Sequence, residues 1–240
     1  MSVRWPEDRD EAVREGLRVF DAVAPRYDLM RSLISFGREA AWKRATLLGA
    51  VARPPARCLD VATGTGDVAA LLLGAFPGTS VVGVDGNRAM LSRARGKVSP
   101  ERARWVLGDL NRLPVEGAGF DVVTLAYGLR YCTDLPAFFA RCRALLRPGG
   151  VFWSFDVGRP ASRLLARLWT AYLFAFGTLL GIFLHGRPTT YWHLPVTLSR
   201  FPGQERVAEL LREAGFSEVR CQDLLGGVLA VHVARNGAPA

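Results

Sequence analysis

The stretch Cys58-Leu-Asp-Val-Ala-Thr-Gly-Thr-Gly-Asp67 decides the fold that this sequence predicts. An apolar strand leads straight into Gly64-Thr65-Gly66, and a segment with the apolar spacing of a helix follows. A backbone can approach a ligand closely only where no Cβ intervenes, which explains glycine at Gly64 and Gly66. Strand, glycine loop and helix together predict the first unit of a doubly wound α/β domain.

The rest of the chain repeats this alternation of strands and helices. With the first strand at 57–62, further strands are predicted at 80–85, 104–107, 120–126 and 151–156. Helices are predicted at 68–76, 88–97, 135–146 and 204–214. Such alternation implies right-handed crossovers and a mostly parallel sheet. Gly226-Gly227 joins two closing strands near 217–223 and 228–234, which predicts a hairpin and an antiparallel last strand.

Turn-forming residues and changes in composition divide the chain into four predicted regions. The 240 residues, half of them hydrophobic, are enough for one sizeable core with a cap. The regions are an N-terminal helical arm or cap (1–50), a ligand-binding core (51–160), an apolar lid insertion (161–202) and a C-terminal helix with strands that complete the core (203–240).

Acidic residues stand where successive strands end. Asp60 precedes the glycine loop, Asp85 ends the second strand, and Asp109 follows the third. These carboxylates would repel a pyrophosphate but attract the ammonium group of S-adenosylmethionine. Asp85 could accept from both ribose hydroxyls, and Asp109 would lie near the adenine amino group. The glycine pattern alone fits a dinucleotide as well, so a nicotinamide oxidoreductase stays open.

Several longer motifs resemble one family. They are Phe20-Asp-Ala-Val-Ala-Pro-Arg-Tyr-Asp-Leu-Met30, Tyr127-Gly-Leu-Arg130, Leu146-Arg-Pro-Gly-Gly150 and Tyr191-Trp-His-Leu-Pro195 with Phe201-Pro202. Across residues 18–236 the chain resembles the ubiquinone/menaquinone biosynthesis C-methyltransferases. The resemblance implies a class I methyltransferase fold, and transfer of a methyl group from S-adenosylmethionine to a ring carbon of a prenylated quinol.

The resemblance also implies roles for individual residues. Cofactor contacts carried over by position fall on Thr65 (or Thr63), Asp85, Asp109 and Leu110, in addition to Asp60, Gly64 and Gly66 of the loop segment. Catalytic roles fall on Arg130, Tyr27 and Asp28. Tyr131, Tyr191 and His193 are predicted as substrate contacts because they are expected near the same pocket. Because arginine stays cationic, Arg130 would stabilise the phenolate that activates the ring carbon, or orient a water that takes the proton.

Two positions depart from the family pattern. Tyr131 follows Arg130 where the family usually has asparagine, and Ala126 stands where a small polar residue is common. Both departures leave open a methyltransferase that acts on oxygen or nitrogen of another hydrophobic small molecule or lipid. The alternative from a different class is a non-catalytic subunit that binds S-adenosylmethionine within a biosynthetic assembly.

Composition narrows the range of partners and compartments. The net charge of +9 suits an anionic membrane face, and no nucleic-acid-binding motif accompanies it. Residues 1–15 lack the apolar core of a signal peptide. The cysteines form no C-x-x-C pair and no metal-like cluster with histidine, so reduced thiols, no metal and a cytoplasmic location are expected. The sequence is also compatible with a homodimer.

An apolar stretch interrupts the alternation of strands and helices. Leu168–Leu184 contains 17 residues without a charge. As a helix it would reach about 26 Å, short of a hydrocarbon core of about 30 Å. Gly177 and Gly181 are expected to interrupt it further. With arginines before and after it, the stretch predicts a helix–loop lid over a hydrophobic substrate, peripheral to the inner face of the membrane.

Overall fold

A computed structural model describes residues 9–237, with the backbone alone for 9–14, His193, Val196, Ser199 and Arg200. A seven-stranded sheet has the order β3-β2-β1-β4-β5-β7-β6. The strands are β1 (Arg57–Val61), β2 (Ser80–Asp85), β3 (Ala103–Leu107), β4 (Phe120–Ala126), β5 (Leu146–Val157), β6 (Ser217–Leu224) and β7 (Leu229–Arg235). Because β7 runs antiparallel to both β5 and β6, the predicted mixed sheet is confirmed.

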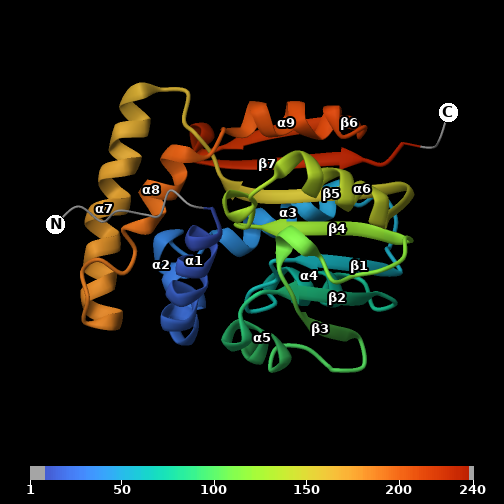
Figure 1. Cartoon of the computed structure of the whole chain (residues 1–240), viewed down its shortest axis with the longest axis horizontal. Coiled ribbons are helices and arrows are strands. Elements are labelled where there is room, and N and C mark those ends of the chain that lie inside the picture. Colours follow the sequence, from blue (N-terminus) through green and yellow to red (C-terminus); the bar gives the residue numbers. More distant parts are fainter. Residues whose placement is uncertain (1–8, 238–240) are drawn as a thin grey trace.

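Helices cover both faces of the sheet and one of its ends (Figure 1). They are α1 (Arg9–Val23), α2 (Tyr27–Ile34), α3 (Glu39–Ala50), α4 (Asp67–Ala75), α5 (Arg88–Arg95), α6 (Leu135–Leu145), α7 (Arg163–His185), α8 (His193–Arg200) and α9 (Gln204–Glu213). Two short 3-10 turns matter for the site, η3 (Leu129–Tyr131) and η4 (Leu225–Gly227). The expected bounds of β2 and β4 match, whereas β5 begins five residues early because Leu146 already pairs with Phe120.

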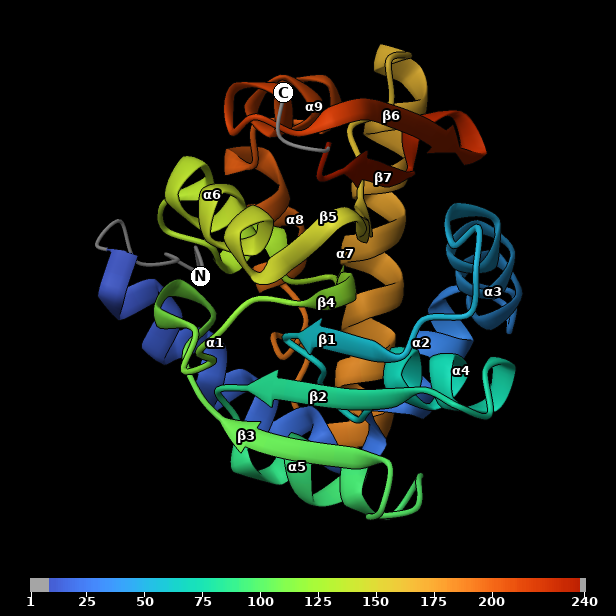
Figure 2. The same ribbon diagram turned by 90° about the vertical axis from the view of Figure 1, so that its right-hand side faces the viewer.

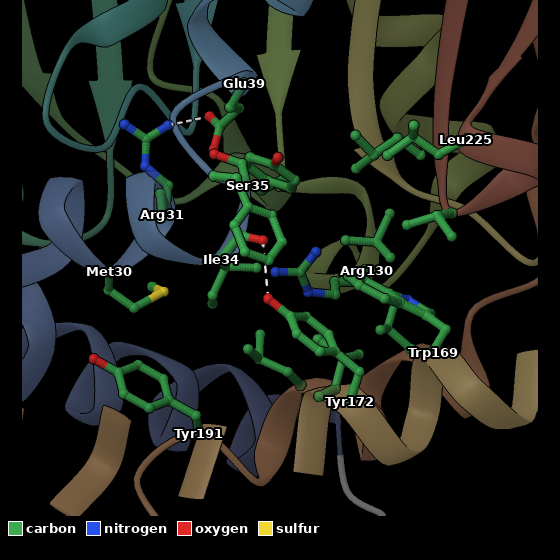
Figure 3. A pocket seen from close by; sticks show the side chains of 18 of the residues that line it. Met30, Arg31, Ile34, Ser35, Glu39, Arg130, Trp169, Tyr172, Tyr191 and Leu225 are labelled. Atoms are coloured by element: carbon green, nitrogen blue, oxygen red, sulfur yellow. Dashed lines mark hydrogen bonds and ion pairs between the residues drawn. The ribbon is translucent and has the colours of Figure 1, made fainter. Parts of the chain in front are cut away.

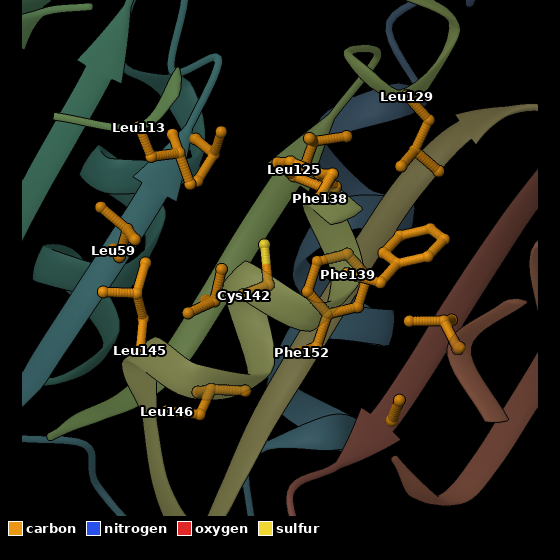
Figure 4. Packing of buried hydrophobic residues seen from close by; sticks show 14 of the residues in the cluster. Leu59, Leu113, Leu125, Leu129, Phe138, Phe139, Cys142, Leu145, Leu146 and Phe152 are labelled. Atoms are coloured by element: carbon orange, nitrogen blue, oxygen red, sulfur yellow. The ribbon is translucent and has the colours of Figure 1, made fainter. Parts of the chain in front are cut away.

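Two hydrophobic clusters hold the helices to the faces of the sheet. Figure 2 shows α6 on one side of the sheet and α3 with α4 on the other. The side chains of successive residues in β5 point to opposite faces of the sheet, as in any pleated strand. Phe152 packs with Phe139 and Cys142 of α6 (Figure 4), and Trp153 packs in the cluster that contains Leu47 of α3. The sheet is therefore buried on both faces, which is typical of parallel strands.

A third cluster lies beyond the carboxyl ends of the parallel strands. There α1, α2, α7 and α8 gather at one end of the sheet (Figure 1). Val23, Met30, Leu180 and Tyr191 form its centre, and Met90 of α5 joins it. Because strand ends and helices meet here, this region has the space and the side chains for a site.

The apolar stretch is one continuous helix, so the expected helix–loop lid is corrected. Gly177 and Gly181 are buried where the following segment crosses α7. A Cβ on Gly181 would come within 2.4 Å of the Arg187 carbonyl oxygen, and one on Gly177 within 3.2 Å of Tyr191 Cβ. The glycines therefore serve a close approach and do not interrupt the helix. By length and composition α7 is long and apolar enough to cross a membrane.

Candidate active site

A cavity of about 430 Å³ opens at the carboxyl ends of β1, β2, β3 and β4. Its walls are backbone turns and apolar side chains, including Ala62, Val84 and Met90. Asp85, Asp109 and the neighbouring Leu110 also line it, and no basic side chain of the described residues does. Carboxylates without a cation suit a positively charged ligand that carries no phosphate. We refer to this space as the cofactor cavity.

Asp85 is held at the floor of the cofactor cavity by two backbone groups. Its Oδ2 accepts from Gly64 N and its Oδ1 from Asn87 N, each at 2.8 Å. Each oxygen can accept another hydrogen bond, as recognition of two hydroxyls would require. Burial raises the pKa of Asp85, although the two N–H groups oppose that effect. Asp109 accepts from Asn111 N at 2.8 Å at the start of the turn that contains Leu110.

The N-terminal helical arm lines the cofactor cavity at positions that the sequence did not single out. Gly16, Leu17 and Phe20 of α1 line it. Asn87 anchors the arm, since its Nδ2 donates to the Leu17 carbonyl oxygen at 3.2 Å and to Asp21 Oδ1 at 2.7 Å. The position of Asn87 as the N-cap of α5 could have been predicted, but its contact with an element 70 residues away could not.

A small cavity of about 30 Å³ lies beneath the glycine loop. Asp60, Thr63 and Thr65 line this space, while Gly64 lines both it and the cofactor cavity. Asp60 is 1% exposed and accepts from Thr124 Oγ1 at 2.7 Å. Burial raises the pKa of Asp60 to about 6, against the effect of the Thr63 and Thr124 hydroxyls. Lys43 and Arg31 line the same small cavity, and the charge of Lys43 also opposes the effect of burial on Asp60.

Gly66 serves the packing of the loop and lines none of these cavities. Its φ is +80°, and a Cβ there would come within 2.9 Å of the Ala94 Cβ of α5. Close approach between loop and helix explains the glycine, and the expected ligand contact at Gly66 stays a prediction.

Asp28 belongs to an ion cluster that joins α2 to the glycine loop. It accepts from Thr65 Oγ1 and pairs with Lys97 Nζ, both at 2.6 Å. Lys97 also pairs with Asp67, and so does Arg31. Burial would raise the pKa of Asp28, but its bonds to Lys97 and Thr65 lower it overall. Asp28 lines none of these cavities, and its contacts fix the glycine loop against α2, so its catalytic role stays a prediction.

A second large cavity, of about 380 Å³, lies between α2, α3, α7 and η4. Most of its lining is apolar or aromatic, with Trp169 and Tyr172 stacked at 5.4 Å between ring centroids. Figure 3 shows α2 side chains such as Met30 and Ile34 opposite these α7 rings, with Arg130 among them. Such walls suit a hydrophobic molecule that carries one polar group. We refer to this space as the acceptor cavity.

Arg130 brings a fixed positive charge into the acceptor cavity. Its Nη1 lies 2.7 Å from Asp156 Oδ1, and both side chains are at most 5% exposed. Asp156 is held in turn by the N–H groups of Leu129, at 3.1 Å, and Val157, at 2.8 Å. Burial would lower the pKa of Arg130, but Tyr131 and Asp156 raise it above its usual value. Asp156 is a partner that the sequence patterns did not single out.

The two large cavities meet at the rings of Phe20, Tyr27 and Tyr127, which line both. Burial raises the pKa of both tyrosines, so their hydroxyls stay protonated at neutral pH. Tyr127 has a φ of +60°, a strained value for a bulky residue. Strain of this kind persists where surrounding contacts dictate the conformation, as at sites that align two ligands.

The predicted substrate contacts divide among different places. Tyr191 lines the acceptor cavity, and its hydroxyl lies 2.8 Å from His185 Nε2. Tyr131 lines the cofactor cavity, with its ring 5.5 Å from that of Phe20 and 5.0 Å from the Arg130 guanidinium, and its substrate contact stays a prediction. The side chain of His193 lies outside the described residues.

Comparison with known proteins agrees with this arrangement. Residues 8–236 match the ubiE/COQ5 methyltransferase family. The chain belongs to the ubiE/COQ5 methyltransferase family. It is 34% identical to the ubiquinone/menaquinone biosynthesis C-methyltransferase UbiE of Rubrivivax gelatinosus, over 97% of this chain and 90% of that protein. It is 36% identical to the demethylmenaquinone methyltransferase of Deinococcus radiodurans, over 95% and 93%.

Membership of the ubiE/COQ5 family makes the chain an S-adenosylmethionine-dependent methyltransferase. A solved methyltransferase from Thermotoga maritima, described as a possible histamine N-methyltransferase, superposes with a TM-score of 0.64 over 92% of this chain and 99% of that one, at 18% identity. The similarity shows the class I methyltransferase fold. S-adenosylmethionine carries a sulfonium and an ammonium group and no phosphate. These charges fit a cofactor cavity lined by two carboxyl groups and, among the described residues, by no basic side chain.

Proposed function

We propose that this methyltransferase C-methylates a prenylated quinol, as in menaquinone or ubiquinone biosynthesis. The observation that supports the proposal best is the acceptor cavity. It is apolar over most of its lining, contains the buried Arg130, and shares three rings with the cofactor cavity. A quinol ring with a lipid tail has the matching chemistry, since it combines one polar end with a long apolar part.

Arg130 is the residue to which we assign the main catalytic contribution. A ring carbon becomes nucleophilic when the neighbouring hydroxyl loses its proton. A fixed guanidinium favours that phenolate, and its effect is strong in a cavity with little water. The ion pair with Asp156 orients Arg130 before the acceptor arrives, so little reorganisation is needed.

The protonated tyrosines and Arg130 are not the base. The pKa values of Tyr27, Tyr127 and Arg130 are all raised, so none of them accepts a proton at neutral pH. The acceptor's hydroxyl proton therefore passes to another group, either water or the carboxylate of Glu39, which also lines the acceptor cavity, and the proton that the ring carbon loses after methylation goes the same way. Tyr27 and Tyr127 contribute by aligning the two ligands where the cavities meet.

We assign Asp85 and Asp109 to the ribose and adenine ends of the donor, and Asp60 to its ammonium group. When bound, S-adenosylmethionine supplies an electrophilic methyl group on a positively charged sulfur. Asp85 has free acceptor capacity on both oxygens. Tyr131 lines the cofactor cavity and its ring lies 5.0 Å from the Arg130 guanidinium, so this departure from the family pattern stands between the donor and the residue to which we assign catalysis.

The experiment is incubation with labelled S-adenosylmethionine and a panel of reduced demethylnaphthoquinols, benzoquinols, simple phenols and amines. We expect label only in the prenylated quinols, with the methyl group on a ring carbon by NMR. Methyl groups on oxygen or nitrogen would instead indicate the related methyltransferase. Tight donor binding without transfer to any acceptor would favour a non-catalytic subunit.

A further inference from the structure

Exposed apolar side chains are concentrated around the acceptor cavity. Among the described residues, every large hydrophobic side chain that is exposed, apart from Leu107, lies on α2 and the turn after it, on α7, or on η4. Single exposed apolar residues are ordinary on protein surfaces, but a contiguous group marks a docking surface. The three segments also form the walls of the acceptor cavity.

Helix α7 is apolar on both its inner and its outer face. Leu173 and Leu180 are buried on the inner side. Leu164, Leu168, Leu179 and Ile182 fall on one outer stripe of a 3.6-residue helix and are 48–68% exposed. A helix with apolar side chains on its outer as well as its inner face is stabilised by an apolar environment on both sides.

The rim of the acceptor cavity continues this outer stripe of α7. Phe36, Leu168 and Leu225 line the cavity and are 78%, 58% and 54% exposed. Phe36 has a φ of +51° and Leu225 one of +53°, values that bulky residues rarely adopt. Strain of this kind is stored at functional positions. Exposing these apolar side chains to water is unfavourable, whereas burying them against an apolar partner is favourable.

Charge distinguishes between the partners that could cover this surface. Residues 157–204 contain five arginines and no Asp or Glu. Arg163 and Arg167 lie exposed on α7 beside the stripe. In a symmetric dimer through this face both copies would present the same segment, which offers the arginines no acidic partner. A surface of anionic lipid matches both the apolar stripe and the arginines.

We propose that the outer stripe of α7 and the rim formed by Phe36, Leu168 and Leu225 dock on an anionic lipid bilayer, with the acceptor cavity opening into the lipid. Helix α7 would lie along the surface and not span it, because its inner face lines the cavity and packs on the segment after it. The inference rests on the proposed lipid-tailed acceptor for its purpose. The docking itself is measured without acceptor or donor.

The test is flotation of the full chain with vesicles of phosphatidylcholine, with and without phosphatidylglycerol. We expect wild type to float with anionic vesicles. R163Q/R167Q should bind about 25-fold more weakly, since each arginine near an anionic surface contributes about fivefold. R93Q/R95Q removes the same charge from α5 and should float like wild type.

L164Q/L179Q/I182Q removes apolar area outside the cavity lining and should stay unbound, while L164M/L179M/I182M should float.

F36N/L225N tests the strained rim, because asparagine tolerates positive φ better than phenylalanine or leucine. We expect this variant to unfold at the same or a higher temperature than wild type, yet to float poorly. Equal flotation of all variants, or no flotation of wild type at low salt, would overturn the inference. So would a dimer in analytical ultracentrifugation that L164Q/L179Q/I182Q converts to a monomer, because a second copy would then cover the stripe.

A kinetic measurement separates this inference from the proposed function. With a short-tailed, water-soluble quinol, R163Q/R167Q and L164Q/L179Q/I182Q should retain wild-type kcat/KM. With a long-tailed quinol in anionic vesicles, their KM should rise by the same factor as vesicle binding weakens. Unchanged KM for the embedded quinol would overturn the docking inference alone. Failure of wild type on every quinol would overturn the proposed function and leave flotation to be judged separately.

Discussion

The cofactor cavity and the acceptor cavity share three aromatic rings but are built differently. Turns at strand ends form most of the cofactor cavity, with Gly64, Gly86 and Gly108 in its lining. Side chains from helices beyond the sheet form the acceptor cavity. The first depends on backbone fixed by the parallel sheet, and the second on how α2, α3 and α7 pack. Donor recognition can therefore be encoded in short motifs, whereas acceptor recognition depends on tertiary structure.

Loss of the Arg130 charge in the acceptor cavity should have the largest effect. Arg130→Ala should lower kcat by about 10²–10³-fold, because a preorganised group that stabilises the phenolate is gone. Donor affinity by calorimetry should stay within about twofold, since Arg130 lies outside the cofactor cavity lining. A methyl-transfer assay with a quinol measures the loss.

Because Arg130→Ala leaves Asp156 buried without its partner, thermal unfolding must be followed as well. Arg130→Lys keeps a positive charge but not the planar fork and should lie between wild type and alanine. Arg102→Ala is the matched control, since Arg102 donates to carbonyl oxygens of Leu73 and Phe76 outside the cavities. Turnover equal to wild type in Arg130→Ala would remove this residue from the mechanism.

The converse test acts on the cofactor side. Asp85→Asn should weaken donor binding by about 10–100-fold, because hydrogen bonds to a charged acceptor contribute about 1.5–3 kcal/mol. KM for the acceptor at saturating donor should not change. Asp121→Asn is the control, because Asp121 also accepts from two backbone N–H groups at 2.8 Å, at the opposite end of β4. Equal affinity for the donor in Asp85→Asn and Asp121→Asn would contradict the assignment.

On each side about half of the predicted residues line the expected cavity, but the reasons differ. Strand ends and glycines are local signals, so Gly64, Asp85, Asp109 and Leu110 could be placed together before the fold was known. Side-chain direction within a turn has no such signal. Successive residues of a 3-10 turn point about 120° apart, and Arg130 and Tyr131 consequently face different cavities.

Long-range packing explains the remaining differences. Tyr27 and Asp28 are about 100° apart on α2, so one lines the cavities and the other reaches the glycine loop. The approach of α1 to the cofactor cavity depends on Asn87, and no local pattern encodes that contact. From the sequence, Gly177 and Gly181 were expected to interrupt the helix. Glycine also occurs where another segment packs closely against a helix, and the sequence alone does not distinguish the two cases.

A pH titration tests whether the small cavity beneath the loop belongs to the donor. Burial raises the pKa of Asp60 to about 6, so this carboxyl is ionised above pH 6 and protonated below it. A cationic ligand prefers the ionised form. We expect Kd for S-adenosylmethionine, measured by calorimetry, to rise below pH 6 by at most about tenfold per pH unit.

The same shift has the opposite sign for the ligand-free protein. A raised carboxyl pKa means that folding favours the protonated form, so this group adds to the free energy of unfolding as pH falls from about 6 toward the unfolded value of 3.8. Asp60→Asn should remove both slopes. An identical rise of Kd below pH 6 in Asp60→Asn would place the titrating group elsewhere.

The smallest expected effect concerns how α7 is attached, and it separates the two cavities most cleanly. An alanine Cβ at Gly181 would lie 2.4 Å from the Arg187 carbonyl oxygen, so the backbone that crosses α7 would have to move. Overpacking of this kind costs about 1–3 kcal/mol, which the better helix propensity of alanine offsets by about 1 kcal/mol. The unfolding temperature should fall by a few degrees.

Gly49→Ala on α3 is the matched control, because its Cβ would meet nothing within 4 Å and the change should stabilise. Since α7 walls only the acceptor cavity, Gly181→Ala should raise KM for the quinol and leave donor affinity unchanged, and a loss of donor affinity would show that the two cavities are not independently supported.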